Sequence, residues 1–95
     1  MEEEYVKEVI IKDKTENEKN IDLVKSIIST RIALNEAHNN FNFAEEDMID
    51  YYSYQIKANE SKLDYLTKLA KINNLSLEAI NNIYANLKVN NDRAG

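Results

Sequence analysis

The chain contains a single glycine, Gly95 at its last position, and no proline. Tight turns, strand hairpins and crossovers between parallel strands depend on these two residue types, so a chain without them makes few sharp connections. Leucine, alanine, lysine and glutamate, which favour helices, are frequent instead. The sequence therefore predicts an all-α protein built from a few long helices.

Length and charge narrow the possible functions. The 95 residues make one domain at most, near the lower limit for a self-sufficient core, so a partner or a second copy is expected to add stability. Cysteine is absent, which excludes disulfides and thiolate metal sites. The net charge of -5 opposes the phosphate backbone, so direct nucleic-acid binding is not expected.

The acidic start, "MEEEYVKEVIIKDK", lacks the basic-then-apolar order of a signal peptide. No apolar run approaches the roughly 20 residues that cross a bilayer. We therefore expect a cytoplasmic protein without a membrane partner. Residues 1–20 are predicted to be a polar tail and linker, 21–88 the helical bundle, and 89–95 a frayed end.

Apolar residues at three- and four-residue steps predict two long helices. The first spans residues 21–41, with Asn20 as its N-cap, and the second spans 46–72. The second helix has a coiled-coil-like seam at Ile49, Tyr52, Ile56, Asn59, Leu63, Leu66 and Ala70. The connection is short, so the helices should form an antiparallel hairpin in which Ile27 meets Leu63 and Val24 meets Leu66.

The stretch "NNLSLEAINNIYANLK" predicts a shorter third helix that completes a small bundle. Ser76 is a suitable N-cap, and Leu75 and Ile80 have the spacing of a hydrophobic staple. The Asn pairs in this region are given no functional weight.

Tyrosines crowd the start of the second helix. Tyr52 lies on the seam, whereas a second stripe is offset from it by roughly 130° at 100° per residue. Its members are Tyr51, Tyr54, Ala58, Tyr65 and Ile72. This stripe is packed under the third helix or the run "YVKEVII", or contacts another protein, or stacks on a base or sugar. The acidic surface opposes the last alternative.

Polar residues are expected inside the hairpin. The antiparallel register brings Arg31 near Asn59 and Glu60, and His38 near Tyr52. A buried Arg31 needs a carboxylate, and Glu60 is the obvious partner, so these residues and a half-buried His38 are predicted to form a structural polar layer that fixes the register.

Catalytic machinery is not recognisable in the sequence. There is no glycine-rich phosphate loop, and His38, the only histidine, lacks the companions of a metal site. The acidic cluster Glu45, Glu46, Asp47 and Asp50 is explained by its place at a helix start, where negative charge complements the helix dipole. We expect no enzymatic activity, cofactor or metal.

The hairpin sequence resembles the YaaL-like family (DUF2508), a bacterial family of unknown function, over residues 23–75. The shared positions are Ala37, Phe41, Ile49, Asp50, Tyr54, Ile56, Ala58, Glu60, Tyr65, Leu66, Ala70 and Lys71. Leu63 departs from the pattern, which has a basic residue there followed by an aromatic one. The resemblance implies no known activity, but Tyr54, Ala58 and Tyr65 belong to it although they lie off the seam.

These observations predict a non-enzymatic protein-interaction module whose contact surface is Tyr51, Tyr54, Ala58 and Tyr65. Its partner is another protein or a second copy of the chain. The alternative is an acidic regulator that binds a nucleic-acid-handling protein by charge mimicry. Steep weakening with ionic strength would distinguish the alternative from a tyrosine-based contact.

Overall fold

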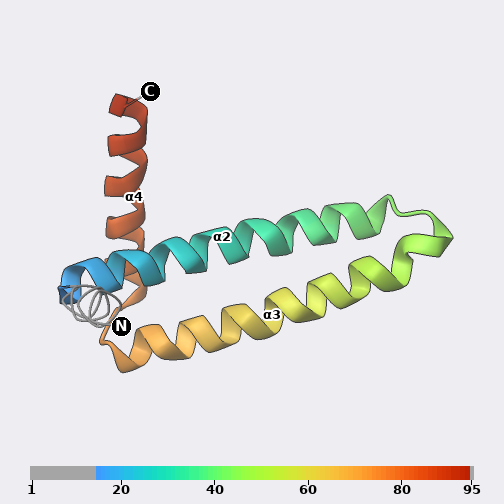
Figure 1. The fold of residues 1–95 in the computed structure, drawn as a ribbon, viewed down its shortest axis with the longest axis horizontal. Helices are drawn as coiled ribbons and strands as arrows, with labels where there is room; N and C mark the ends of the chain where they lie inside the picture. The colour runs from blue at the N-terminus through green and yellow to red at the C-terminus, as the bar shows by residue number, and fades with distance from the viewer. Residues whose placement is uncertain (1–14, 95) are drawn as a thin grey trace, which may run out of the picture.

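A computed structural model describes the backbone of residues 15–94 and the side chains of residues 15–89. The elements, in chain order, are α2 (Glu16–Asn42), the 3-10 turn η1 (Glu46–Met48), α3 (Ile49–Ile72) and α4 (Leu77–Ala94) (Figure 1). Over this range the chain forms helices and no strand, which confirms the predicted all-α class.

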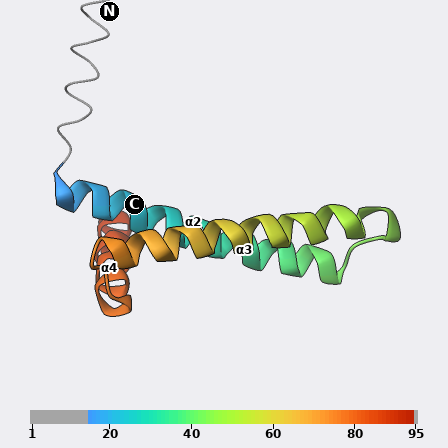
Figure 2. The same cartoon turned by 90° about the horizontal axis from the view of Figure 1, so that it is seen from below.

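The two long helices, α2 and α3, run antiparallel and side by side, and the connection between them closes one end of the hairpin (Figures 1 and 2). Their packing is the main tertiary contact of the molecule. The antiparallel hairpin is confirmed, and Val24, Ile27 and Leu66 belong to one buried cluster against which Leu63 packs, in agreement with the pairs predicted there.

The core lies at the open end of the hairpin, away from the connection. Its buried members are Leu23, Val24, Ile27, Leu66, Ala70 and Ile80. Toward the connection, Ala37 of α2 is buried, but Ile49 at the start of α3 is exposed. Phe43, in the connection itself, is 89% exposed. The two ends of the hairpin therefore differ strongly in how much apolar surface they bury.

The first helix begins earlier than predicted. Thr15, not Asn20, is its N-cap, and the Thr15 hydroxyl accepts a hydrogen bond from the backbone N–H of Glu18 at 3.1 Å. Acidic side chains in the first turn add favourable interactions with the helix dipole. Residues 16–20 are therefore helical rather than linker, and the predictions for residues 1–14 lie outside the described part of the chain.

A Schellman motif ends α3. The N–H of Leu75 donates to the carbonyl of Ala70 at 2.9 Å, and the N–H of Asn74 donates to that of Lys71 at 3.1 Å. This arrangement requires a left-handed residue, and Asn74 supplies it with φ of 60°. Asn74 thus occupies the left-handed position at which glycine is usually found.

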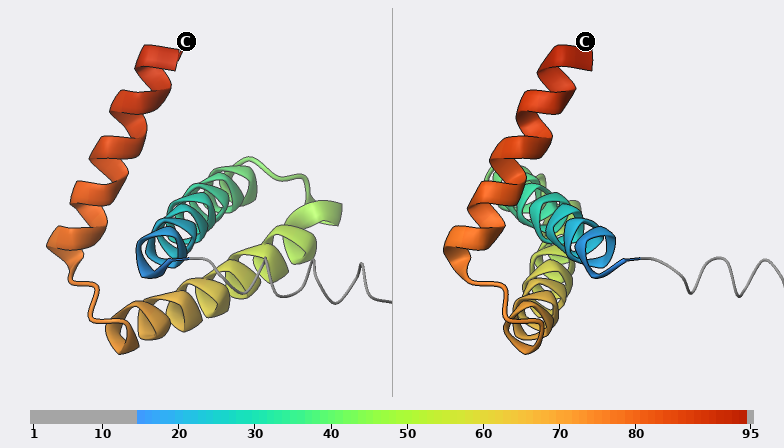
Figure 3. Two further views of the ribbon diagram at one scale, coloured as in Figure 1. Left: turned by 60° about the vertical axis from the view of Figure 1, so that its left-hand side comes forward. Right: turned by 90° about the vertical axis from the view of Figure 1, so that its left-hand side faces the viewer.

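The last helix, α4, starts as predicted, because the Ser76 hydroxyl accepts a hydrogen bond from the N–H of Ala79 at 3.0 Å. It continues to Ala94, and the expected fraying from residue 89 stays a prediction. It packs on the core through Ile80 and Ile83. It crosses the open end of the hairpin and projects away from it (Figure 3). Its contact with the hairpin is much smaller than that between α2 and α3.

Candidate functional surface

Four residues of α3, Tyr51, Tyr54, Ala58 and Tyr65, form an exposed surface that we call the tyrosine face. Tyr54 is 70% exposed, Tyr65 63% and Tyr51 51%. Moving a large aromatic side chain out of water lowers the free energy of the protein. Three exposed rings on one helix forgo this stabilisation unless they serve a contact.

The ring of Tyr51 is held in place. It meets Tyr52 edge to face, with the ring centroids 5.1 Å apart and the planes at 70°. The side-chain amide of Gln55 donates a hydrogen bond to the Tyr51 hydroxyl at 2.7 Å. Tyr52 is half-buried on the seam, so it links the exposed ring to the hairpin interior.

The last helix does not cover the tyrosine face. The α4 helix packs mainly on α2, and the residues of α3 that line a hollow with Ile80 of α4 are Thr67, Ala70 and Lys71, which lie on the other side of α3 from the tyrosines. The expectation that the third helix packs over the tyrosines is therefore wrong. The other proposed cover, the run "YVKEVII", lies outside the described residues.

The predicted polar layer does not form as a buried layer. Arg31, Glu60 and His38 are exposed, and Asn59, which is half-buried, donates from its side chain to the carbonyl of Gln55 at 2.9 Å. Within residues 15–89 the ion pairs join Lys19 to Glu16 and Lys68 to Asp64, so the expected pair between Arg31 and Glu60 is absent. A long Arg side chain beside the seam reaches water, where it needs no buried partner.

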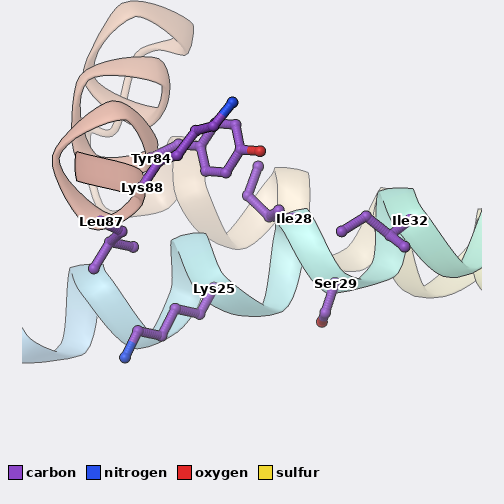
Figure 4. Close-up of a pocket in the computed structure, with 7 residues that line it drawn as sticks. All are labelled: Lys25, Ile28, Ser29, Ile32, Tyr84, Leu87 and Lys88. Carbon is purple, nitrogen blue, oxygen red and sulfur yellow. The ribbon is translucent and has the colours of Figure 1, made fainter. Parts of the chain in front are cut away.

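A groove between α2 and α4 was not predicted. It has a volume of about 450 Å³ and is lined by Lys25, Ile28, Ser29, Ile32, Tyr84, Leu87 and Lys88. Figure 4 shows Ile28 and Tyr84 pointing toward each other, while Lys25 and Ser29 point away from α4. Apolar spacing on both helices signalled these residues, but spacing does not reveal the angle at which α4 crosses α2.

Within the described residues, no three His, Cys, Asp or Glu side chains lie close enough together to hold a metal ion. The cluster of Glu45, Glu46, Asp47 and Asp50 is exposed, at the start of η1 and α3. None of the described helices is sufficiently long and apolar to traverse a bilayer.

Comparison with known proteins gives one match. The family model described as "Protein of unknown function (DUF2508)" matches residues 10–77, which include α2, η1, α3 and the first residue of α4. No curated protein and no solved structure matches the chain. The tyrosine face lies wholly inside the matched region.

Proposed function

Because the chain belongs to the DUF2508 family, whose function is unknown, we propose its function from its own surface. The protein is a non-enzymatic, cytoplasmic interaction module that binds a protein through the tyrosine face. The observation that carries this proposal is the exposure of Tyr51, Tyr54 and Tyr65 on a helix whose other side is already packed against α2.

The chemistry of the tyrosine face suits a protein contact. Tyrosine offers apolar area and a hydroxyl at little cost in side-chain entropy, which is why it is frequent at interface hot spots. Tyr51 is partly ordered in advance by Tyr52 and Gln55, and this lowers the entropy lost on binding. Ala58 leaves space between the rings for a partner side chain.

The test is the double variant Tyr54→Ala/Tyr65→Ala. Both side chains are exposed, so the circular dichroism spectrum and melting temperature should change little. Binding to the partner, measured as self-association by light scattering or as capture from an extract of the source cells, should fall at least about tenfold, as for loss of hot-spot residues.

The matched control is Tyr84→Ala, which removes an exposed tyrosine from α4 instead of α3. This variant should bind as the unchanged protein does. Loss of helicity in the double variant would show that the tyrosines are core residues and would remove the basis of the proposal. Binding that survives the double variant but disappears with added salt would favour charge mimicry by the acidic surface.

A further inference from the structure

A second seven-residue repeat runs along α3, separate from the seam that contacts α2. In heptad notation, its a positions are Tyr51, Ala58, Tyr65 and Ile72, and its d positions are Tyr54, Ser61 and Lys68. All seven side chains are exposed. The a positions are aromatic or apolar throughout, whereas Ser61 and Lys68 at the d positions are polar. A row of apolar side chains at seven-residue spacing is a pattern by which one helix packs along another, and no second helix covers this row in the described fold.

Charges flank this repeat in a regular order. The g positions are Asp50, Lys57, Asp64 and Lys71, so the sign alternates from one heptad to the next, and all four are exposed. In an antiparallel pair of helices the g positions of one helix face the g positions of the other. Because the second helix runs in the opposite direction, each carboxylate of one helix lies opposite an ammonium group of the other.

We propose that the partner of the tyrosine face is a second copy of this chain, bound with the two α3 helices antiparallel. This inference rests on the proposed function and specifies its partner. Tyr54 then lies opposite Tyr65 of the second copy, and Ala58 opposite Ser61 of the second copy. The small residues lie at the two-fold axis, and an aromatic layer flanks them on each side.

Electrostatics selects this orientation over the parallel one. In the antiparallel pair, Asp50 faces Lys71 of the second copy and Lys57 faces Asp64 of the second copy, so symmetry gives four attractive pairs. The outer layers place Tyr51 against Lys68 of the second copy, which is a cation–π geometry. In a parallel pair, Lys68 would instead face Lys68 of the second copy, and Lys57 would lie close to Lys62 of the second copy. Both contacts bring like charges together and are repulsive.

The described fold leaves room for this contact. The α4 helix packs mainly on α2, and it comes near α3 around Thr67 and Ala70, away from the tyrosine face. Lys68 is paired with Asp64 at 3.1 Å in the same helix, but both side chains are more than two-thirds exposed. That pair is accessible to Lys57 of the second copy, so the contact adds to it rather than breaking it.

The first experiment exchanges charges at the g positions of the full chain. Asp50→Lys/Asp64→Lys makes this flank wholly basic, and Lys57→Glu/Lys71→Glu makes it wholly acidic. Sedimentation equilibrium from about 1 µM to about 1 mM covers weak and moderate affinities. The unchanged protein should approach dimer mass, each variant should stay monomeric, and an equal mixture of the two variants should recover dimer mass.

The matched control, Glu36→Lys/Glu60→Lys, changes the net charge as much as the basic variant does but at exposed positions off this flank. It should dimerise like the unchanged protein. Equal weakening by the control and the basic variant would show a general charge effect and overturn the proposed pairing. Dimerisation that neither g-position variant weakens would overturn it as well.

The second experiment reads the orientation through introduced thiols, which are the only ones present because the chain has no cysteine. Tyr51→Cys mixed with Lys68→Cys should give a disulfide-linked dimer on mild oxidation. Neither variant should crosslink alone, because in the antiparallel pair its two thiols lie about 25 Å apart along the helices. Crosslinking of each variant with itself would indicate a parallel pair and overturn the proposal.

Failure of this inference can be told apart from failure of the proposed function. A monomer at every concentration, together with capture of a different protein that depends on Tyr54 and Tyr65, would overturn self-association and leave the interaction module standing. A Tyr54→Ala/Tyr65→Ala variant that matches the unchanged protein in both mass and capture would overturn both.

Discussion

At the residue scale, Thr30 shows how this small core accommodates a polar group. It is the only buried polar or charged residue among those whose side chains are described, with 2% of its surface exposed. Its hydroxyl donates to the carbonyl of Ser26 at 2.7 Å, one turn earlier in α2. A threonine that satisfies its own hydroxyl in this way behaves as a core residue of nearly valine shape.

Thr30→Val should therefore leave the free energy of unfolding within about 1 kcal/mol of that of the unchanged protein. The carbonyl of Ser26 keeps its helical hydrogen bond, and both residues are β-branched. Thr30→Ala, the matched control, should lower the free energy by about 1 kcal/mol or more, because it leaves a cavity. Urea unfolding followed by circular dichroism measures both, and a larger loss for valine than for alanine would contradict this account.

At the element scale, the sequence was sufficient where periodicity decides the structure. Three- and four-residue spacing placed Ile27 and Leu66 in one core, and the good cap at Ser76 fixed the start of α4. It was insufficient where two residues compete for one role, since Thr15 and Asn20 are both able N-caps and the cap hydrogen bond forms at Thr15.

The candidate site was predictable to a different degree. Helical phase separated Tyr54 and Tyr65 from the seam, and the structure shows them exposed, while their role in binding stays a prediction. The prediction of a buried polar layer was wrong because helical phase gives only the direction in which a side chain leaves the helix. A long side chain such as that of Arg31 is still free to extend into water. The groove beside Tyr84 depends on a crossing angle that spacing does not encode.

The Schellman motif gives a prediction at this scale. Asn74→Val should lower the free energy of unfolding by about 1–2 kcal/mol, because a β-branched residue strongly disfavours positive φ. Asn74→Gly should match or exceed the stability of the unchanged protein. Asn73→Val is the control, since Asn73 has φ of -86° and avoids the left-handed penalty. Thermal unfolding compares the three, and equal losses at both positions would argue against the motif.

At the scale of the whole molecule, the fold is open and uneven. Its radius of gyration is 17.4 Å, against about 12 Å for a compact domain of this length. The buried cluster of Val24, Ile27, Leu66, Ala70 and Ile80 joins all three helices at one end. The other end of the hairpin has little buried apolar surface, so local opening there exposes little and costs little.

Native-state hydrogen exchange should follow this gradient. Amides of residues 24–31 and 66–72 should exchange slowest, through global unfolding, whereas those of residues 38–42 and 52–56 should exchange faster, through local opening. The comparison is best made at low concentration, where self-association does not add protection. Equal protection at the two ends of the hairpin would contradict an uneven core.

The α3 helix packs on α2 with one face and exposes Tyr54 and Tyr65 on another, so we expect changes in its length to be constrained. One inserted residue near its middle turns everything after it by about 100°, which would carry Tyr65 out of line with Tyr54 and break the apolar seam against α2. Seven inserted residues turn it by only about 20° in the opposite sense and preserve both faces. Length changes in this helix should therefore be tolerated in whole heptads that α2 matches, and hence in steps of 21 nucleotides in the gene.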